Sequence, residues 1–400
     1  MKKKILILMP SMFIGGAERS LLGLLDAMDY TQYEVDLFLF RQEGEFLPHI
    51  PKTVRLLRSM WQYTTFDVPI VSLLKSKKVL FGLSRILSKV CMKLHCLFTR
   101  EKPGVWMELQ YISRFLQWLL PPIPGHYDLA IHFLGVPEVL ANKVSADVKI
   151  AWNHTDYTTV HPRMGWDRQV YEKIDYIASV SQPCTEQLLR VHPELSGKAV
   201  TVENILSPGL LQAQADMSAT DMKKAENEIS ILSVGRFCEA KNFDNVPDIC
   251  RRIRAAGWNV RWYLIGYGTD EALIREKIRE AGMEEFVIIL GKKENPYCYM
   301  RSCDLYVQPS RYEGKCVSVR EAQMLGKPVV ITNFPTASSQ LTDGVDGVVV
   351  PMDNAGCATG IMQLLENPEK MEQLIQNCRQ NDYSNAEEVE KIYAFLDGSN

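Results

Sequence analysis

Short, uninterrupted apolar runs alternate with segments of helical periodicity along the first half of the chain. The runs cover residues 4–10, 35–40, 54–57, 127–133, 149–153 and 176–181. After the first run, Leu21, Leu24, Leu25 and Met28 recur at the spacing of one helix face. Strands that are apolar on both faces and separated by helices are typical of a parallel sheet that helices cover on both sides. We therefore predict a doubly wound α/β domain in this half.

The same pattern starts again in the second half of the chain. The apolar runs there cover residues 229–234, 260–265, 287–290, 305–308 and 328–332. A polar stretch at 207–228 separates the two sets of runs, and we interpret it as a linker. The second half is therefore predicted to form another doubly wound α/β domain.

A final helical segment, residues 386–396, carries apolar side chains on one face. They are Val389, Ile392, Tyr393 and Leu396. We predict domains at 1–206 and 207–380, and a C-terminal helix within 381–400 that packs back on the first domain. Parallel α/β sheets bind ligands beyond the carboxyl ends of their strands. Two Rossmann-like domains facing across a cleft would therefore bind their ligand in that cleft.

Length and composition agree with a globular protein of two domains. The chain has 400 residues, of which 46% are hydrophobic and 23% are charged. Three lysines at 2–4 precede the first apolar run as in an export signal, but Pro10 and the Gly15-Gly16 pair interrupt the run. We interpret this run as a buried strand and expect a cytoplasmic protein. The ten cysteines form no CxxC pair and no zinc-site spacing, so we expect free thiols and no metal centre.

The net charge of −3 is divided unevenly along the chain. Residues 1–205 contain 24 Lys and Arg against 20 Asp and Glu, whereas the remainder contains 21 against 28. Much of the basic excess lies at 73–100, an otherwise apolar stretch without an acid. Its cations are Lys75, Lys77, Lys78, Arg85, Lys89, Lys93 and Arg100. The patch is too local to indicate nucleic-acid binding, so no nucleic-acid partner is expected.

Basic amphipathic helices with aromatic residues are suited to anionic membrane surfaces. Trp106, Tyr111, Phe115 and Trp118 follow the basic stretch. We therefore expect residues 73–120 to contact an anionic membrane surface, on the inner face of the cell membrane. The alternative is a pair of solvated helices that covers the first sheet, with lysine stems lying over apolar surface.

The richest chemistry lies in segment 309–321, between a predicted strand and a predicted helix. Ser318 and Glu321 have the spacing of a capping box, which predicts that the helix begins at Ser318. Amides at a helix N-terminus attract phosphate, and Gly314 on the preceding loop permits close backbone approach. Glu313 and Glu321 would then flank one ligand. The alternative, which spacing alone favours, is that Glu321 only caps the helix and Glu313 is a surface acid.

Two cations follow the strand predicted at 229–234. Arg236 closes this strand and Lys241 opens the next predicted helix, so both are expected at the carboxyl edge of the sheet. A guanidinium fork and an ammonium group together can neutralise a diphosphate. The alternative is a pair of surface cations.

Two glycine pairs also follow predicted strands. Gly15 and Gly16 come after the first strand, where the backbone can approach a phosphate or a sugar. Gly266 and Gly268 lack the third glycine of a dinucleotide fingerprint, so they are weak evidence for NAD binding.

In this order the motifs resemble the retaining glycosyltransferases of family 4, which have the GT-B fold. The motifs that carry the resemblance are Gly15-Gly16-Ala17-Glu18-Arg19, Val234-Gly235-Arg236-Phe237, Lys241-Asn242, Gly266-x-Gly268 and the pair Glu313 and Glu321. Asn295-Pro296-Tyr297 and residues 309–314 are similar to the branch that builds bacterial surface polysaccharides such as capsules. The resemblance covers nearly all of the second domain. In the first domain it covers only the first strand, turn and helix and the strand that ends at His154.

The resemblance implies roles for the matched residues of the nucleotide site. Arg236 and Lys241 would hold the donor diphosphate, with the amides of Val317 and Ser318 assisting. Glu321 would bind the ribose hydroxyls. By this resemblance, the second domain binds the nucleotide sugar and the first binds the acceptor.

Further matched residues would surround the sugar. Contacts to the donor sugar would come from Glu313 and from the backbone of Gly314, Lys315 and Cys316. Gly15 and Gly16 would form the floor that faces the diphosphate. His154 would lie near the transferred sugar.

The implied activity is retaining, metal-independent hexosyl transfer from a nucleotide-diphosphate sugar to a saccharide or lipid-linked saccharide. A UDP-sugar is the expected donor, and no cofactor is expected besides this substrate. Cations and helix-terminal amides would stabilise the negative charge that develops on the departing nucleoside diphosphate. Two alternatives stay open, a nucleotide-sugar epimerase on the same fold and a non-catalytic sugar-nucleotide-binding protein.

Overall fold

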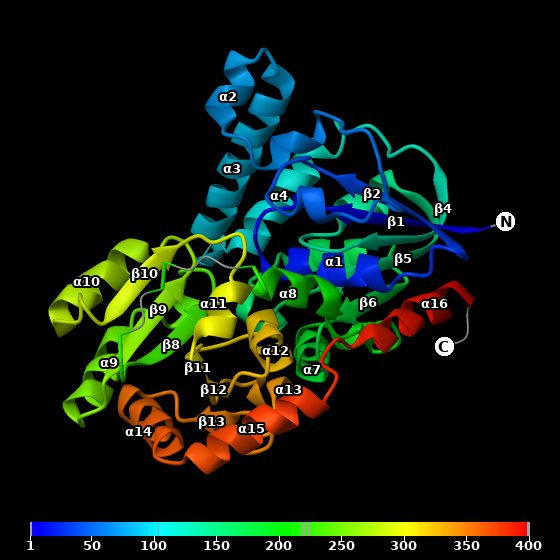
Figure 1. The fold of residues 1–400 in the computed structure, drawn as a ribbon. Helices are drawn as coiled ribbons and strands as arrows, with labels where there is room; N and C mark the ends of the chain where they lie inside the picture. The colour runs from blue at the N-terminus through cyan, green and yellow to red at the C-terminus, as the bar shows by residue number, and fades with distance from the viewer. Residues whose placement is uncertain (1, 103, 218–220, 223–224, 398–400) are drawn as a thin grey trace. The chain divides into compact units, whose positions relative to one another are not determined.

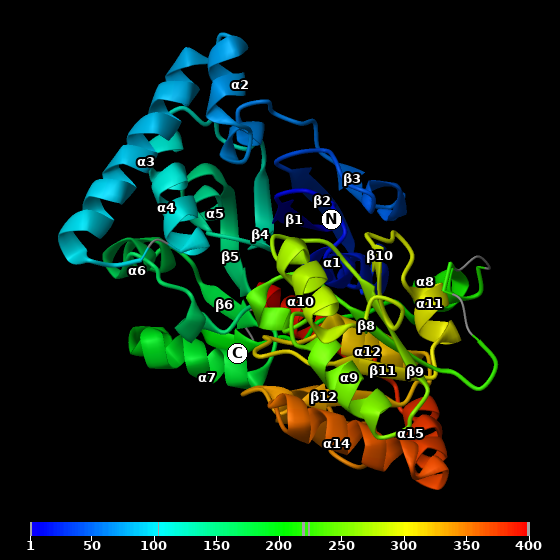
Figure 2. The same cartoon turned by 90° about the vertical axis from the view of Figure 1, so that its left-hand side faces the viewer.

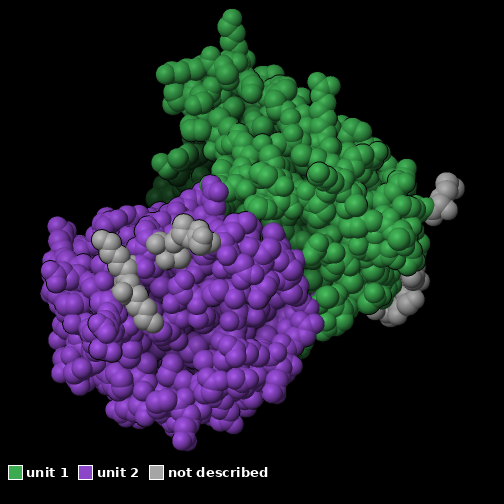
Figure 3. Space-filling model, in the orientation of Figure 1, with its two compact units in different colours: residues 1–205, 386–400 green, residues 206–385 purple. Residues whose placement is uncertain are grey.

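The computed structural model describes residues 2–102, 104–217, 221–222 and 225–397 (Figure 1). The chain forms two compact units, which are coloured separately in Figure 3. Unit 1 comprises residues 1–205 and 386–400, and unit 2 comprises residues 206–385. The chain therefore leaves unit 1, forms all of unit 2, and returns to unit 1 for its last helix.

Unit 1 is built on a parallel sheet of seven strands in the order β3-β2-β1-β4-β5-β6-β7. The strands are β1 (Lys3–Met9), β2 (Tyr33–Leu39), β3 (Arg55–Leu56), β4 (His126–His132), β5 (Ser145–Asn153), β6 (Tyr176–Ser179) and β7 (Ala199–Thr201). Its helices are α1 (Gly16–Ala27), α2 (Ile70–Lys75), α3 (Val79–Thr99), α4 (Val105–Leu116), α5 (Glu138–Lys143), α6 (Met164–Tyr171), α7 (Gln182–Val191) and α16 (Val389–Asp397).

Unit 2 is built on a parallel sheet of six strands in the order β10-β9-β8-β11-β12-β13. The strands are β8 (Ile229–Val234), β9 (Val260–Ile265), β10 (Val287–Gly291), β11 (Leu305–Gln308), β12 (Val329–Thr332) and β13 (Val348–Val350). Its helices are α8 (Pro208–Ala215), α9 (Val246–Ala255), α10 (Glu271–Ala281), α11 (Tyr297–Ser302), α12 (Val317–Met324), α13 (Ala337–Gln340), α14 (Asn354–Leu365) and α15 (Pro368–Gln380).

Successive strand residues of unit 2 enter two separate apolar cores. Ile231 and Leu264 pack with α9, α10 and α14 on one face of the sheet. Leu232 and Tyr263 pack with α8, α11 and α12 on the other face, and Figure 1 shows helices on both sides. Burial on both faces explains why these strands read as continuous apolar runs. The prediction of doubly wound α/β sheets is confirmed.

The last helix, α16, packs within unit 1. The ring of Tyr393 stacks on Tyr33 with centroids 4.2 Å apart, and its hydroxyl accepts a hydrogen bond from the backbone N–H of Asp29 at 2.8 Å. Phe395 contacts Tyr176 of β6, with ring centroids 4.4 Å apart. These contacts hold the last helix of the chain against β2 and β6, which lie far from it in the sequence.

The stretch predicted to be basic and amphipathic forms α2, α3 and α4. The chain turns between α2 and α3 at Lys77, whose φ is +59°. Both views show α3 running alongside α4 (Figures 1 and 2). Phe81 and Met92 are buried on the inner side of α3, and Met92 packs with Met107 and Tyr111 of α4.

The prediction omits strands β7 and β13, and it treats helix α8 as part of a linker. Strands β7 and β13 are three-residue edge strands, too short for a periodic signal. Helix α8 begins inside the predicted linker, and the Ser207 hydroxyl caps it by accepting the N–H of Leu210 at 3.2 Å. Residues 218–220 and 223–224 of that linker lie outside the described residues. All ten cysteines are free thiols, as predicted.

Candidate functional site

The strand order of unit 2 creates a topological switch point between β8 and β11. From β8 the chain builds β9 and β10 on one side of the sheet, and then β11, β12 and β13 on the other. The loops that follow β8 and β11 thus diverge from neighbouring strand ends, which is where ligands bind in doubly wound sheets. These loops are residues 235–245 and 309–316, and they carry half of the predicted site residues.

Backbone hydrogen bonds fasten the two loops to each other. The N–H of Arg311 donates to the carbonyl of Ala240 at 2.8 Å. The side-chain amide of Asn242 donates to the carbonyl of Pro309 at 2.9 Å. Asn242 has a φ of +59°, a left-handed conformation that asparagine tolerates better than most residues. The conformation turns the chain directly after Lys241.

Lys241 and Glu313 meet at this junction. The Lys241 Nζ lies 2.6 Å from Glu313 Oε1, and the two side chains are 17% and 10% exposed. The stem of Lys241 lies over Gly235, because a Cβ atom at that glycine would come within 3.1 Å of Lys241 Cε. The hydroxyl of Ser310 donates to the same Glu313 oxygen at 2.5 Å. Oε1 therefore accepts both bonds, and none of the described residues donates to Oε2.

Electrostatics keeps Lys241 charged. Burial opposes the charged amine, but Cys316 and Glu313 outweigh it and raise the pKa of Lys241 above its ordinary value. The Cys316 sulfur lies 3.7 Å from Lys241 Nζ. Burial, reinforced by Glu313, raises the pKa of the Cys316 thiol to about 11, so the thiol is neutral at physiological pH.

Three polar side chains from β11, β12 and the loop after β12 hold the Glu313 loop in place. The Thr336 hydroxyl donates to the Glu313 carbonyl at 2.8 Å. Thr332 donates to the Ser310 carbonyl at 2.5 Å, and Gln308 donates to the Ser310 hydroxyl at 2.9 Å. Sequence reasoning missed these residues. The available signal was position alone, since Gln308 and Thr332 are the last residues of two buried strands.

Helix α12 begins beside Lys241, but the predicted capping box is wrong. The helix begins at Val317, after Cys316, and makes no side-chain cap. The Ser318 hydroxyl donates instead to the Val234 carbonyl at 3.2 Å. Glu321 is 1% exposed and accepts the Tyr297 hydroxyl at 2.7 Å. Both side chains thus have tertiary partners that spacing along the sequence does not reveal.

The backbone at the start of α12 is also fixed. The Cys316 N–H donates to the Gln340 side chain at 2.7 Å, and the Gln340 amide donates back to the Cys316 carbonyl at 3.1 Å. Lys315 is 9% exposed, and its Nζ donates to the Ser339 carbonyl at 2.5 Å. The amides of Val317 and Ser318 are the first of the helix, the positions that a helix leaves without intrahelical acceptors.

Arg236 differs from the other predicted residues. It lies two residues beyond the end of β8 and its side chain is exposed. Among the described residues, none forms an ion pair or hydrogen bond with its guanidinium. The structure therefore brings together Lys241, Glu313, Cys316 and Ser318, and leaves Arg236 as a solvated cation near them in sequence.

Gly266 and Gly268 serve the packing of the loops after β8 and β9. A Cβ atom at Gly266 would lie 1.9 Å from the Gly235 carbonyl oxygen, and one at Gly268 would lie 2.2 Å from the Phe237 oxygen. Only glycine permits this approach. The spacing that resembles part of a dinucleotide fingerprint thus has a structural cause beside the Lys241 loop.

In unit 1 the corresponding switch point lies between β1 and β4. Gly15 is the N-cap residue of α1 and Gly16 is its first residue, so both lie where the loop that follows β1 enters the helix. His154 follows β5, and its Nε2 donates to the Phe133 carbonyl at 2.8 Å. Burial lowers the pKa of His154 to about 4, so the ring is neutral and Nδ1 keeps its lone pair.

Sequence reasoning missed His132, the last residue of β4. Its ring is 1% exposed, and neither ring nitrogen has a hydrogen-bond partner among the residues that the structure describes. Burial lowers its pKa to about 4. The available signal was a histidine inside an apolar strand, which by itself does not distinguish a core residue from a functional one.

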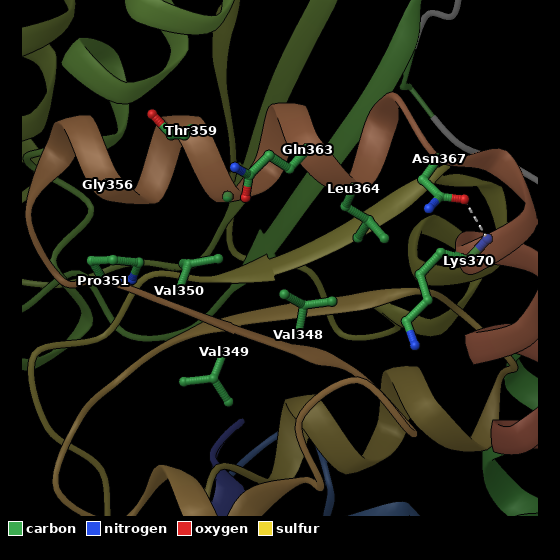
Figure 4. Close-up of a pocket in the computed structure, with 11 residues that line it drawn as sticks. Val348, Val349, Val350, Pro351, Gly356, Thr359, Gln363, Leu364, Asn367 and Lys370 are labelled. Atoms are coloured by element: carbon green, nitrogen blue, oxygen red, sulfur yellow. Dashed lines mark hydrogen bonds between the residues drawn. The ribbon is translucent and has the colours of Figure 1, made fainter.

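No group of three or more His, Cys, Asp or Glu side chains in the described part of the chain is arranged to hold a metal ion. A cavity of about 410 Å³ lies elsewhere in unit 2, between β13 and α14 (Figure 4). Figure 4 shows Leu364 of α14 facing Val348 and Val350. Lys370, which also lines the cavity, donates a hydrogen bond from Nζ to the Gly344 carbonyl at 2.5 Å. The cavity is separate from the Lys241 loop and contains none of the predicted site residues.

Residues 218–381 match the family described as Glycosyl transferases group 1. This segment therefore forms a domain of the group 1 glycosyl transferase family. The resemblance inferred from the motifs is thereby confirmed. The matched segment includes Arg236, Lys241, Glu313 and Glu321.

Curated relatives of this chain include bacterial glycosyltransferases that match part of it. The amylovoran biosynthesis glycosyltransferase AmsD of Erwinia amylovora is 28% identical over 158 residues, which are 39% of this chain and 44% of AmsD. The N-acetylgalactosamine-N,N'-diacetylbacillosaminyl-diphospho-undecaprenol 4-alpha-N-acetylgalactosaminyltransferase of Campylobacter jejuni is 27% identical over 206 residues, or 50% of this chain and 53% of the relative. The chain thus matches about half the length of these relatives.

Solved structures resemble the whole chain. Anabaena HepE, crystallised with UDP and glucose, has a TM-score of 0.66 at 17% identity and covers 99% of this chain and 100% of its own. A TarM variant from S. aureus has a TM-score of 0.68 at 14% identity, over 98% and 99% of the two chains. These likenesses show that the fold is GT-B.

Proposed function

We propose that this group 1 glycosyl transferase is a retaining hexosyltransferase with a UDP-sugar as its donor. Its acceptor would be a saccharide or lipid-linked saccharide in the synthesis of a bacterial surface polysaccharide such as a capsule. The names of AmsD and of the Campylobacter jejuni enzyme support the acceptor class. The UDP and glucose in the HepE crystal support the donor class.

The Lys241–Glu313 pair at the start of α12 carries this proposal. A nucleoside diphosphate leaves with growing negative charge, which fixed cations and helix-terminal amides stabilise. Lys241 is held charged within 3.7 Å of the Cys316 sulfur, directly before this helix. We assign the diphosphate to Lys241, the exposed Arg236, and the amides of Val317 and Ser318.

Glu313 is assigned to the donor sugar. Its Oε1 is already bonded to Lys241 and Ser310, which orients the carboxylate. Oε2 is left to accept a sugar hydroxyl, and the backbone of Gly314, Lys315 and Cys316 lies beside it along the chain. Thr336 fixes the Glu313 backbone, so Glu313 Oε2 is in position before the nucleotide sugar binds.

Glu321 is assigned to the ribose. The Tyr297 hydroxyl bonds to Glu321 Oε1 and restricts the carboxylate to one orientation. A carboxylate fixed in this way can accept hydrogen bonds from two neighbouring hydroxyls. We further assign Gly15 and Gly16 of unit 1 to the donor diphosphate, and His154 of unit 1 to the transferred sugar. His154 would act there through its Nδ1 lone pair, as a hydrogen-bond acceptor.

Protein cations are proposed to do what a metal ion does in other sugar transferases, so the transfer would need neither a metal nor a cofactor. A first test is a thermal-shift screen of UDP, ADP and GDP and of their sugars. A nucleotide that binds the folded chain raises its melting temperature by mass action. UDP-sugars are expected to give the largest shift, with or without a chelator.

A second test incubates the chain with the best donor alone. Slow release of UDP and free sugar is expected of a transferase whose acceptor is missing. Accumulation of an epimerised nucleotide sugar would instead identify an epimerase. Binding without any turnover, even with saccharide and lipid-linked acceptors present, would leave a non-catalytic binding protein.

Glu313→Gln separates chemistry from nucleotide binding. The amide keeps the shape but loses the charge that faces Lys241. Transfer is expected to fall by about 100-fold or more, as when one fixed polar group is lost from a catalytic site, whereas UDP affinity changes little. Initial rates and calorimetry measure the two effects. A fully active variant would contradict the assignment of Glu313.

A further inference from the structure

Helix α3 has apolar side chains on two opposite faces. The inner face carries Phe81 and Met92, which are buried toward α4 and the sheet. The outer face carries leucines and other large apolar residues at steps of three or four, the spacing of one helix stripe. Its residues are Val79, Leu80, Leu83, Ile86, Leu87, Val90, Leu94, Leu97 and Phe98.

The outer face of α3 is exposed over its whole length. Leu80, Leu97 and Phe98 are 67%, 72% and 83% exposed. Val105 at the start of α4 and Trp118 just beyond its end are also exposed, at 77% and 86%. Scattered apolar residues are normal on a protein surface, but a continuous stripe of this extent marks a binding surface.

Cations flank this stripe without acids to neutralise them. Lys89 and Lys93 are exposed one turn apart at its border, and Lys75 and Lys77 lie exposed just before α3. No Asp or Glu occurs at 68–100. Two cations of this stretch lie against the protein: Arg85 donates to the carbonyls of Thr65 and Val68, and the amine of Lys78 lies over the Trp61 ring.

Either a second copy of the chain or a lipid bilayer could cover the apolar stripe, and the lysines beside it favour the bilayer. A second copy of the chain would bring Lys89 and Lys93 close to the same lysines of its neighbour, with no acid on the stripe to compensate. An anionic bilayer matches both parts of the surface, since acyl chains take up the apolar stripe and lipid phosphates pair with the lysines. The helix is about 30 Å long, given a rise of about 1.5 Å per residue.

We propose that α2 and α3 bind an anionic lipid bilayer, with the outer face of α3 in the boundary between headgroups and acyl chains. The helix would lie in the plane of the surface and not cross it. None of the helices within the described residues is long and apolar enough to cross a membrane. The proposal depends only on unit 1 and is independent of the donor site in unit 2.

The test is flotation of the full chain with vesicles. Vesicles of phosphatidylcholine alone are compared with vesicles that also contain phosphatidylglycerol, at low and high salt. The wild-type chain is expected to float with the anionic vesicles and to be released in part by salt, which screens the lysines. A wild-type chain that floats with neither kind of vesicle would overturn the proposal.

Two variants separate the apolar and ionic contributions. Leu83→Gln/Leu87→Gln/Leu94→Gln removes apolar contact at exposed positions, and binding to both kinds of vesicle should be lost. Lys89→Glu/Lys93→Glu should lower binding to the anionic vesicles by about tenfold or more, because each basic residue near the surface contributes about a factor of five.

Matched controls change the same chemistry elsewhere. Leu273→Gln alters an exposed leucine of α10, and Lys52→Glu/Lys173→Glu makes the same change in net charge. Both controls should float as the wild type does. Equal flotation of the triple glutamine variant and the wild type would contradict the assigned face.

Two parallel measurements distinguish a lost membrane contact from misfolding and from self-association. Hydrogen exchange in β1, β2 and β6 reports on the fold of unit 1, so a variant that keeps wild-type exchange there and loses flotation has lost only the membrane contact. Light scattering after size exclusion reports on self-association. A wild-type dimer that the triple variant converts to a monomer, without vesicle binding by either, would make this face a contact between copies and overturn the proposal.

Discussion

At the scale of single residues, the environment of Lys241 is unlike that of a surface lysine. Its stem lies over Gly235, its amine contacts Glu313 and the Cys316 sulfur, and its side chain is only 17% exposed. A cation held in this way needs little reorganisation when an anion arrives, so its contribution to binding is obtained at low entropic cost.

Removing this cation is expected to weaken UDP binding. Lys241→Ala should raise the Kd of UDP about 10- to 100-fold, as when a hydrogen bond to a charged group worth about 1.5–3 kcal/mol is lost. Lys241→Met keeps the stem over Gly235 and should show a similar loss, which separates charge from packing. Arg236→Ala should act in the same direction.

Isothermal titration calorimetry measures these affinities. Arg275→Ala is the control, because Arg275 is an exposed arginine of α10 whose partner is Glu271 in the same helix. Unchanged UDP affinity in the Lys241 and Arg236 variants would remove both cations from the nucleotide site.

His132 should make the free energy of unfolding depend on pH. Burial lowers its pKa from about 6.5 to about 4, so it stays neutral in the folded chain while the unfolded chain takes up a proton below about pH 6.5. Stability due to this residue is therefore present above pH 6.5 and is lost as the pH falls toward 4. The full loss is on the order of 3 kcal/mol, from about 1.4 kcal/mol for each pKa unit.

Variants without the imidazole should show a shallower dependence. His132→Leu and His132→Phe are expected to lose less stability than the wild type between pH 7 and pH 4.5, as measured by urea denaturation at each pH. His154 acts in the same direction and keeps part of the slope in both variants. Equal slopes in the wild type and both variants would show that His132 does not carry this penalty.

Single residues were only partly predictable from the sequence. The family resemblance drew attention to Lys241 and Glu313, and the structure shows them in contact. Spacing alone favoured reading Glu313 as a surface acid, because it cannot show that two loops 72 residues apart converge. The roles of Ser310 and Gln340 could not be predicted, since both residues act through hydrogen bonds that form only in the folded chain.

At the scale of elements, the closeness of the loops after β8 and β9 sets the position of Lys241. Gly266→Ala would place a Cβ atom 1.9 Å from the Gly235 oxygen and 2.9 Å from a Phe237 ring carbon. Neither is a flexible side-chain end, so the loops must separate. We expect a loss of about 2–3 kcal/mol in the free energy of unfolding, in the upper part of the usual range for one substitution.

The matched control is Gly209→Ala in α8, where a Cβ atom meets nothing within 4 Å. This change should be neutral or slightly stabilising, because alanine restricts the unfolded chain. Chemical denaturation compares the two variants. A Gly266→Ala variant as stable as the wild type would show that the loops can part without cost.

Elements buried on both faces were predicted best. The runs at 229–234, 260–265 and 305–308 coincide with β8, β9 and β11. The three-residue strands β7 and β13 were missed because neither is long enough to show a period, whereas the edge strand β10 falls in a predicted run. The start of α12 was misplaced for a different reason, since the Ser318 and Glu321 side chains bond across the fold and do not cap the helix.

At the scale of the whole molecule, the stability of unit 1 depends on the last helix of the chain. Tyr393→Ala removes a stacked, nearly buried ring and its bond to the Asp29 backbone. The expected loss is about 3 kcal/mol, as for other large-to-small changes at buried aromatic residues. Tyr393→Phe keeps the ring and should cost about 1 kcal/mol, the value of one hydrogen bond.

The loss should be confined to unit 1. Hydrogen exchange followed by mass spectrometry is expected to show faster exchange in β1, β2 and β6 of the alanine variant, with β8 and β11 unchanged. UDP affinity should also stay as in the wild type. Faster exchange spread evenly over both units would show that they unfold together.

The route of the chain through the two units has a consequence for biosynthesis. Unit 2 is contained between residues 206 and 385, whereas unit 1 needs residues on both sides of that interval. On the ribosome, the segment made second can therefore reach its final form before the segment made first. A premature stop codon near the end of the message would damage the part of the protein that was translated earliest, and would spare the part translated just before the stop.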